Sequence, residues 1–352
     1  MGDIVSECVI TRRTKTYSTI KFNGYGGITK VNCTPLSVAR HRLSATHVGD
    51  YALFGGGLGS SSYSNTVDAY DTSLTRTTPT ALSVSRGYLS ATHVGDYALF
   101  GGGYTSESYY STVDAYNTSL TRSTPTALSA ARDELSATHV GDYALFGGGY
   151  GSESYKSAVD AYNTSLTRTT PTFLNDGKAV LAATHVGNYA LFGGGVNGAI
   201  YYSTVDAYDT SLTRRTPAPL SVSRRDLSAT HVGDYALFGG GLGSSPVYKS
   251  TVDAYNTSLT RSTPTELSAG RSELSATHVG DYALFGGGYG SSPVYKSTVD
   301  AYDTSLTRST PTELSGARCY LAATHIGNYA LFGGGGHIGG HQSTVDAYNV
   351  IS

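Results

Sequence analysis

One segment, Leu-Phe-Gly-Gly-Gly, occurs seven times in this chain of 352 residues. Its copies begin at Leu53, Leu99, Leu145, Leu191, Leu237, Leu284 and Leu331, so consecutive copies are always 46 or 47 residues apart. Self-similarity at a period of about 20 to 50 residues is typical of solenoids, propellers and other repeat architectures. The repeat therefore limits the fold more than any other feature of the sequence.

Each copy contains four short segments with strand character, which in the second copy are residues 89–94, 97–100, 111–116 and 120–128. They are rich in β-branched and aromatic residues and are separated by turn-forming Val-Gly-Asp, a glycine-rich loop and Asn-Thr-Ser. No window has a helical period of useful length. Four-stranded units repeated seven times predict an all-β fold, a seven-bladed β-propeller of antiparallel blades.

The two ends of the repeat region complement each other. The sequence ends just after the third strand segment of the seventh copy, which therefore lacks an outer strand. When Arg40 is aligned with Arg86, residues 28–30 fall on residues 74–76. We therefore expect residues near 28 to 38 to complete the seventh blade and to leave no open sheet edge. The propeller would span residues 28–352, and residues 1–27 would form an arm of unknown role.

The order of motifs in each copy is an arginine, a short strand, Tyr-Ala-Leu-Phe-Gly-Gly and Val-Asp-Ala-Tyr. Over about residues 28–352 this order resembles the Kelch repeat, and the chain is similar to Kelch-like proteins of gut Firmicutes and their prophages. It departs from the usual Kelch pattern by having Leu74, Leu120 and their equivalents where that repeat keeps a tryptophan, and by a shorter turn after the tyrosine. The resemblance implies the propeller fold and leaves the function open, because Kelch propellers serve very different tasks.

Charge and composition exclude several classes of partner. The 24 basic and 26 acidic residues give a net charge of −2, so we expect no nucleic-acid partner. No apolar run approaches the roughly 18 residues of a membrane span, so we expect no membrane insertion. The three cysteines are too few for a disulfide framework or a multi-cysteine zinc site. The first residues lack the features of a secretory signal, which favours a cytoplasmic or virion-associated protein.

Comparison of the seven copies shows where they differ. The turn between strands one and two is always Gly-Asp or Gly-Asn, and the turn between strands three and four is Asp-Thr-Ser or Asn-Thr-Ser in every complete copy. The loop between strands two and three varies, as do the two residues before strand one, from His41-Arg42 to Cys319-Tyr320. In an antiparallel meander both variable segments lie on the same side of the ring. A variable face on a uniform scaffold is typical of a recognition surface. The alternative is that these loops drift because nothing packs on them.

The variable face is rich in tyrosine among serine and glycine, a mixture that is also found in antibody paratopes. Such a surface can stack on sugar rings or contact a protein. The candidate ligand-binding residues here are Tyr63, Tyr88, Tyr109, Tyr110, Tyr155, Lys156, Tyr201, Tyr202, Tyr248, Lys249, Tyr295, Lys296 and Tyr320.

A basic residue precedes strand one in every copy. These residues are Arg40, Arg86, Arg132, Lys178, Arg224, Arg271 and Arg318. Because of this position just before strand one, we expect a cationic ring near the channel mouth on the variable face. Guanidinium groups suit carboxylate, sulfate or phosphate ligands. The Kelch resemblance implies the same role, since arginines at the matching place contact acidic peptides in some Kelch propellers. The alternative is an ion pair within each blade, with neighbours such as Asp133, Glu134, Asp226 and Glu273.

A histidine also recurs in every copy, as His47, His93, His139, His185, His231, His278 and His325. Identical copies argue against catalysis, because an active site needs one differentiated group of residues. We expect strand histidines that are hydrogen-bonded within each blade. The repeated Asp68, Asp114, Asp160, Asp206, Asp253, Asp300 and Asp346 have a structural role in the same interpretation, and Tyr70 and its equivalents pack between blades.

Three histidines lie outside the repeat: His41, His337 and His341. Ring closure would bring them near one another, but no carboxylate or cysteine ligand falls at a telling spacing, so we expect no metal and no cofactor. Some Kelch enzymes are copper oxidases that use tyrosine and histidine, and Cys319-Tyr320 is the only match to such a site.

The triple glycines are not phosphate loops, because no helix follows them; they allow close approach of the blades.

The sequence thus favours a non-enzymatic recognition protein that binds a protein or glycan ligand on its variable face, with a possible role in host attachment or adhesion. Two alternatives remain open. One is an enzyme of the Kelch type acting on an acidic sugar. The other is a structural subunit that assembles through its uniform face.

Overall fold

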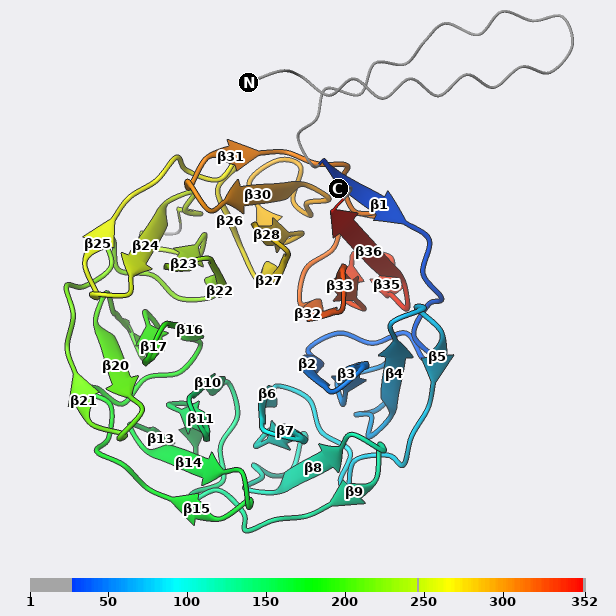
Figure 1. The fold of residues 1–352 in the computed structure, drawn as a ribbon, viewed down its shortest axis with the longest axis vertical. Helices are drawn as coiled ribbons and strands as arrows, with labels where there is room; N and C mark the ends of the chain where they lie inside the picture. The colour runs from blue at the N-terminus through cyan, green and yellow to red at the C-terminus, as the bar shows by residue number, and fades with distance from the viewer. Residues whose placement is uncertain (1–26, 246, 351–352) are drawn as a thin grey trace, which may run out of the picture.

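Each copy of the repeat folds into one four-stranded antiparallel sheet, and seven such sheets stand around a central channel (Figure 1). The structure is a computed structural model and describes residues 27–245 and 247–350. Every helix or strand assigned in these two ranges is a strand, so this part of the chain has no helix that could cross a membrane. The prediction of an all-β, seven-bladed propeller is confirmed.

The two inner strands of each blade form its most buried part. The Ala-Thr-His segment lines the channel as β2 (Ser44–Val48), β6 (Ser90–Val94), β10 (Ser136–Val140), β16 (Ala182–Val186), β22 (Ser228–Val232), β27 (Ser275–Val279) and β32 (Ala322–Ile326). The Tyr-Ala-Leu-Phe-Gly segment forms β3 (Tyr51–Gly55), β7 (Tyr97–Gly101), β11 (Tyr143–Gly147), β17 (Tyr189–Gly193), β23 (Tyr235–Gly239), β28 (Tyr282–Gly286) and β33 (Tyr329–Gly333). This second strand is buried over four consecutive residues because neighbouring blades cover both of its faces.

The two outer strands complete each sheet. The Val-Asp-Ala-Tyr segment forms β4 (Val67–Asp71), β8 (Val113–Asn117), β14 (Val159–Asn163), β20 (Val205–Asp209), β24 (Val252–Asn256), β30 (Val299–Asp303) and β36 (Val345–Val350). The outermost strands are β5 (Arg76–Thr77), β9 (Arg122–Ser123), β15 (Arg168–Thr169), β21 (Arg214–Arg215), β25 (Arg261–Ser262) and β31 (Arg308–Ser309). They are much shorter than the segment 120–128 predicted for β9. A proline follows each of them closely and cannot donate to a sheet ladder.

The seventh blade is completed from the beginning of the described chain. Strand β1 (Ile28–Val31) pairs with β36 and places Lys30 opposite Tyr348, as β9 places Arg122 opposite Tyr116. Lys30 Nζ lies 3.5 Å from Asp346 Oδ1, which is the ion pair that the outer-strand arginines form elsewhere. The predicted closure is confirmed. Apart from Gly27, the arm predicted for residues 1–27 lies outside the described residues.

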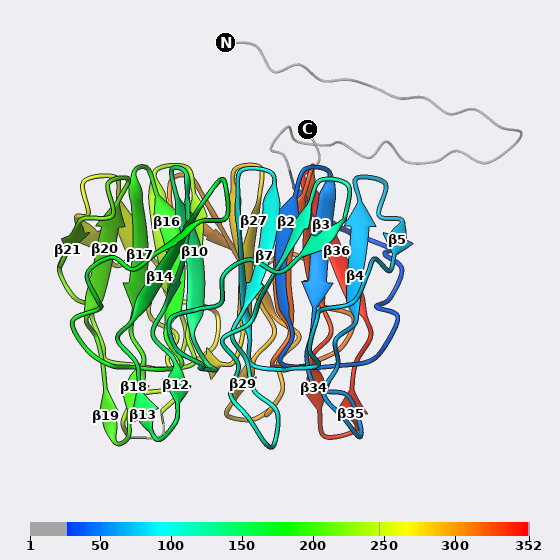
Figure 2. The ribbon, with the colours of Figure 1, turned by 90° about the horizontal axis from the view of Figure 1, so that it is seen from below.

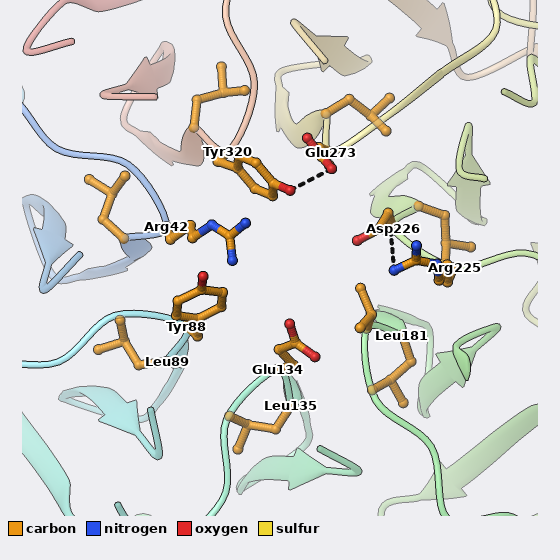
Figure 3. A pocket seen from close by; sticks show the side chains of 15 residues that line it. Arg42, Tyr88, Leu89, Glu134, Leu135, Leu181, Arg225, Asp226, Glu273 and Tyr320 are labelled. Atoms are coloured by element: carbon orange, nitrogen blue, oxygen red, sulfur yellow. Dashed lines mark hydrogen bonds and ion pairs between the residues drawn. The ribbon is translucent and has the colours of Figure 1, made fainter. Parts of the chain in front are cut away.

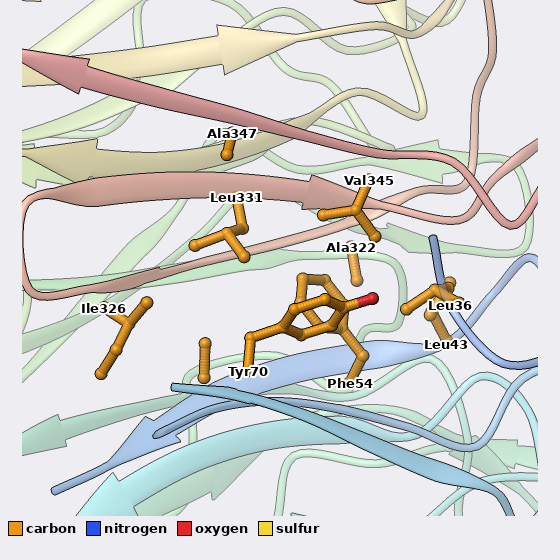
Figure 4. Packing of buried hydrophobic residues seen from close by; sticks show 10 residues of the cluster. Leu36, Leu43, Phe54, Tyr70, Ala322, Ile326, Leu331, Val345 and Ala347 are labelled. Atoms are coloured by element: carbon orange, nitrogen blue, oxygen red, sulfur yellow. The ribbon is translucent and has the colours of Figure 1, made fainter. Parts of the chain in front are cut away.

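The core consists of seven clusters, each shared by two neighbouring blades. In the cluster that closes the ring, Phe54 and Tyr70 of the first blade pack with Ile326 and Leu331 of the seventh (Figure 4). The Phe54 and Tyr70 rings meet edge to face with centroids 5.9 Å apart, and the buried Tyr70 hydroxyl donates to the Thr34 carbonyl at 2.9 Å. The prediction that this tyrosine packs between blades is confirmed.

The triple glycines lie where blades touch. A Cβ added to Gly55 would come within 2.7 Å of Phe100 Cε1 in the next blade. The following Gly56 has φ +69°, and a Cβ there would lie 2.6 Å from the Arg86 carbonyl oxygen. The first glycine is thus required by space and the second also by its left-handed backbone. Their predicted role in the close approach of blades is confirmed.

Both variable segments leave the same end of the ring. In several blades the loop between strands two and three contains two-residue strands that project from that end (Figure 2): β12 (Tyr150–Gly151), β13 (Ser154–Tyr155), β18 (Val196–Asn197), β19 (Ile200–Tyr201), β29 (Tyr289–Gly290), β34 (Gly336–His337) and β35 (Gly340–His341). In the sixth blade the buried strand β26 (Arg271–Ser272) pairs with β29. A bridge joins the two segments in each blade, as between His41 and Leu58 in the first. The variable segments therefore form one continuous surface, which we call the variable face.

Candidate functional site

The seven repeated cations lie inside the blades. Their side chains are at most 1% exposed, and the Arg40 Nη2 atom lies 2.8 Å from Asp68 Oδ2 and donates to the Phe54 carbonyl at 3.1 Å. The pairs are Arg40–Asp68, Arg86–Asp114, Arg132–Asp160, Lys178–Asp206, Arg224–Asp253, Arg271–Asp300 and Arg318–Asp346. This corrects the expected position of these cations at the channel mouth.

The alternative interpretation, an ion pair within each blade, agrees with this buried position of the cations. The carboxylates that pair with them are not the ones that we expected. The carboxylates are those of the third strand, and Asp133, Glu134, Asp226 and Glu273 are left without these cations. The third-strand aspartate suits the role because it is buried and meets a second cation from the outer strand, as Arg122 Nη1 does at 3.0 Å from Asp114. The sequence signal for this pairing was that every copy has both a basic residue before strand one and an aspartate in strand three.

A different set of side chains lines the channel mouth. It consists of the second variable residue after each repeated cation: Arg42, Tyr88, Glu134, Val180, Asp226, Glu273 and Tyr320. Each has a left-handed backbone with φ between +50° and +56°. Each backbone N–H donates to the carbonyl of its equivalent in the preceding blade, at 2.9 to 3.2 Å, and the Arg42 N–H donates to Tyr320 to close the circle. Seven hydrogen bonds thus tie the blades together around the mouth.

These seven residues surround a pocket of about 390 Å³ at the centre of the variable face (Figure 3). We call it the central pocket. Its lining also includes one leucine from each blade: Leu43, Leu89, Leu135, Leu181, Leu227, Leu274 and Leu321. Of the residues predicted as ligand contacts, only Tyr88 and Tyr320 lie in it. The other five mouth residues were not predicted as ligand contacts. The signal that could have identified them is their place as the second residue of the variable pair before strand one.

Charged groups face one another in the central pocket. The Arg42 guanidinium lies between the rings of Tyr88 and Tyr320, 4.1 and 4.0 Å from their centroids. The Tyr320 hydroxyl donates to Glu273 Oε1 at 2.5 Å, as the dashed line in Figure 3 shows. Burial raises the pKa of the Tyr320 hydroxyl, which keeps it protonated as a donor.

Two carboxyl groups of the pocket are shifted towards their neutral form. Burial raises the pKa of Asp226 to about 7, although Arg225 Nη1 lies 3.2 Å from its Oδ2 atom and opposes the shift. Burial also raises the pKa of Glu134. The pKa of the adjacent Asp133 is raised to about 7 by burial and by the charge of Glu134. The pocket can therefore gain negative charge close to neutral pH.

Tyrosine rings surround part of the pocket and contact one another from blade to blade. Centroid distances between neighbouring rings are 4.9 to 6.2 Å. We call this set the tyrosine belt: Tyr63, Tyr104, Tyr109, Tyr150, Tyr155, Tyr248, Tyr289 and Tyr295. Tyr104, Tyr150 and Tyr289 were not predicted as contacts, although each directly follows a triple glycine. All eight are partly exposed.

The remaining predicted contacts lie on the variable face but differ in accessibility. Tyr201 lies against Arg225, whose guanidinium is 5.8 Å from the ring centroid. Tyr202 lies 6.0 Å from the buried Lys178 Nζ atom. Tyr110, Lys156 and Lys249 are partly exposed.

Lys296 is the exception among the predicted lysines. Its side chain is buried, and its Nζ atom donates to the Ser291 carbonyl at 2.8 Å. It is therefore not the accessible cation that was expected.

The repeated histidines line the channel and form a closed ring of their own. Adjacent imidazole centroids are 4.0 to 4.2 Å apart, and His325 contacts His47 to close the ring. Within the described ranges these imidazoles form no hydrogen bonds, which corrects the prediction of bonds within each blade. Burial lowers the pKa of His47 to about 4, and burial with neighbouring histidines lowers that of His139 to about 2.

The three histidines outside the repeat do not converge. His41 and His341 stack with centroids 4.6 Å apart, whereas His337 Nε2 lies 2.6 Å from Gln342 Nε2 and its Nδ1 accepts from the Gly339 N–H. In the part of the chain that the structure describes, no group of three or more His, Cys, Asp or Glu residues could hold a metal ion.

Comparison with known proteins gives information on the fold alone. No protein-family model matches the chain, and no curated protein matches it. A solved structure described as "Structure of YjhT" matches with a TM-score of 0.59 and 14% sequence identity. The match covers 91% of this chain and 99% of that one. At this identity the likeness supports a seven-bladed propeller and carries no information on the ligand.

Proposed function

We propose that this protein is a non-enzymatic recognition protein that binds a protein or glycan ligand on its variable face. The observation that carries the proposal is the contrast between the two ends of one ring. Every blade has four antiparallel strands and a buried ion pair, and the turns at one end are nearly identical in every complete copy. At the other end two bridged segments differ from blade to blade and form one continuous surface.

The chemistry of the tyrosine belt agrees with this proposal. Its rings are large and amphipathic, have few rotatable bonds and already contact one another, so little conformational entropy is lost when a ligand covers them. The same rings can stack on sugars or contact a protein. The resemblance to Kelch repeats and to proteins of gut bacteria and their prophages makes attachment to a host surface our preferred biological setting.

A triple variant of the belt tests the proposal. Changing Tyr104, Tyr109 and Tyr150 to Ser removes three successive rings while leaving the ion pairs and core unchanged. The intact protein and the variant would be compared on a glycan array and in a pull-down, and each identified ligand titrated with both. We expect the variant to bind at least about tenfold more weakly.

The matched control changes three residues at the opposite end of the first three blades. Asp50, Asp96 and Asp142 are exposed turn residues, and two other blades have asparagine at this position. The triple change to Asn should leave binding unaltered. The proposal fails if the intact protein binds nothing in either assay, or if the tyrosine variant binds as tightly as the intact protein.

The second candidate function is an enzyme acting on an acidic sugar. The observation in its favour is that Arg42, a suitable partner for a sugar carboxylate, shares a pocket with Asp226, whose pKa of about 7 suits proton transfer. Incubation of the protein with acidic sugars, followed by NMR, separates the two functions. Turnover that is lost in Asp226→Asn would favour the enzyme, and recovery of every sugar unchanged would count against it.

A further inference from the structure

The central pocket contains one cation without a hydrogen-bonding partner. The Arg42 guanidinium is held by the faces of Tyr88 and Tyr320 and points towards the middle of the pocket (Figure 3). Among the described residues it forms no ion pair, and its buried Nε atom has no hydrogen-bond partner. Aromatic faces fix its position without using its N–H groups. The guanidinium is therefore available to an anionic group of a ligand.

The pocket also contains one carboxyl group that forms no ion pair and accepts no hydrogen bond from a described residue. Asp226 pairs with Arg225, and Glu273 accepts the Tyr320 hydroxyl. Glu134 comes from the blade next to Tyr88, and its carboxyl group accepts no hydrogen bond from a described residue. In Figure 3 the Glu134 carboxyl and the Arg42 guanidinium both point into the open centre. They do not form an ion pair with each other, so both remain available across the same cavity.

Two unpaired charges of opposite sign discriminate between classes of ligand. A simple anion on Arg42 would be repelled by the carboxyl groups of Glu134 and Glu273, and by that of Asp226 when it is ionised. A simple cation on Glu134 would be repelled by Arg42. A molecule with both charges pairs with each group, so that each attraction offsets the repulsion on its other charge. The volume of about 390 Å³ suits a small molecule, and the leucines of the lining can contact its apolar part.

We propose that the central pocket binds a zwitterionic small molecule, with a carboxylate on Arg42 and an ammonium group on Glu134. This inference rests on the proposed function only in taking the variable face as the binding face. It adds the chemical class of a ligand for the pocket at its centre. The backbone ring of hydrogen bonds around the mouth holds the two groups in fixed positions before the ligand arrives.

The test is a calorimetric titration with zwitterions of increasing charge separation. The series is glycine, β-alanine, γ-aminobutyrate and ε-aminocaproate, with leucine as an apolar α-amino acid. Butylamine and butyrate are the matched compounds that have one charge each. We expect at least one zwitterion to bind about tenfold or more tightly than both single-charge compounds.

Two pocket variants and one control assign the contacts. Arg42→Gln should weaken binding of the zwitterion about tenfold or more and remove its advantage over butylamine. Glu134→Gln should weaken it similarly and remove the advantage over butyrate. Arg215→Gln is the control, because Arg215 is 57% exposed on outer strand β21 and pairs with Asp209. It should bind as the intact protein does, and thermal unfolding would establish that all three variants are folded.

Two results would overturn the inference. One is that no member of the series binds at millimolar concentration. The other is that butylamine or butyrate binds as tightly as the best zwitterion. Neither result affects the test of the proposed function, because that test uses the tyrosine belt and macromolecular ligands. Loss of ligand binding in the belt variant, together with no zwitterion binding, would leave the recognition function standing and remove only the small-molecule site.

Discussion

At the residue scale, the repeated arginine shows how a polar group can be part of a core. Arg86 is fully buried, and its Nη2 atom contacts Asp114 at 2.9 Å and the Phe100 carbonyl at 3.2 Å. A buried ion pair of this kind contributes little compared with an apolar pair, but removal of one partner leaves an uncompensated charge. The repeated pair therefore constrains the sequence of each blade strongly.

Arg86→Met should destabilise the protein by about 3–5 kcal/mol, because the buried Asp114 would lose its main partner. Arg86→Lys should cost less, since Lys178 occupies the same position in the fourth blade, with its Nζ atom 3.5 Å from Asp206. Urea denaturation would measure both changes. A loss for Arg86→Met no larger than that for the exposed Arg215→Gln would contradict this account.

At the element scale, strand β1 determines whether the ring is closed. It covers the free edge of β36 and supplies Lys30 to Asp346. Without β1, the backbone groups of β36 would be unpaired at an open edge, which is a site for association between chains. The other six blades have their outer strand within the same repeat.

A chain that begins at residue 34 should therefore unfold at a temperature lower by roughly 5 °C or more than a chain that begins at residue 27. It should also form oligomers in light scattering. A synthetic peptide of residues 27–33, added in excess, should restore both properties. Equal unfolding temperatures for the two chains would show that β1 does not stabilise the ring.

At the scale of the whole molecule, the histidine ring links stability to pH. In the unfolded chain each histidine has a pKa near 6.5, whereas burial lowers the pKa of His47 and His231 to about 4 in the folded protein. The unfolded state therefore binds more protons as the pH falls below about 6.5. The contribution of the neutral, buried imidazoles to the free energy of unfolding is therefore complete above about pH 6.5. It is lost progressively as the pH falls towards 4.

The free energy of unfolding should accordingly fall steeply between about pH 7 and pH 4.5, because all seven histidines act in the same direction. His139→Asn should make this dependence shallower by removing one proton-binding site. Urea midpoints measured across this range would test the prediction. If both proteins show the same pH dependence, the histidine ring does not contribute to it. Comparing the two proteins at about pH 8, where the imidazoles are neutral in both states, measures the separate effect of lost packing.

The architecture follows from the sequence because its determinants are local and repeated seven times. The Tyr-Ala-Leu-Phe-Gly and Val-Asp-Ala-Tyr segments define the strands, and the match between residues 28–30 and 74–76 predicts the closure of the ring. The assignment of both variable segments to one face also follows, since it depends only on the alternation of direction in a meander. Each of these features depends on a pattern that is the same in every blade, so it can be predicted without knowing the contacts of individual side chains.

The partners of individual side chains were decided by the tertiary structure. Arg40 precedes strand one, as the sequence indicates, but its side chain turns into the blade because Asp68 and the Phe54 carbonyl offer buried acceptors there. Arg42 and Glu134 meet in one pocket only because left-handed residues of all seven blades are joined in a circle. The sequence by itself determined the blades, their order and the variable face. Ring closure decided which variable residues share a site, because it brings together positions that are distant in the chain and vary among the copies.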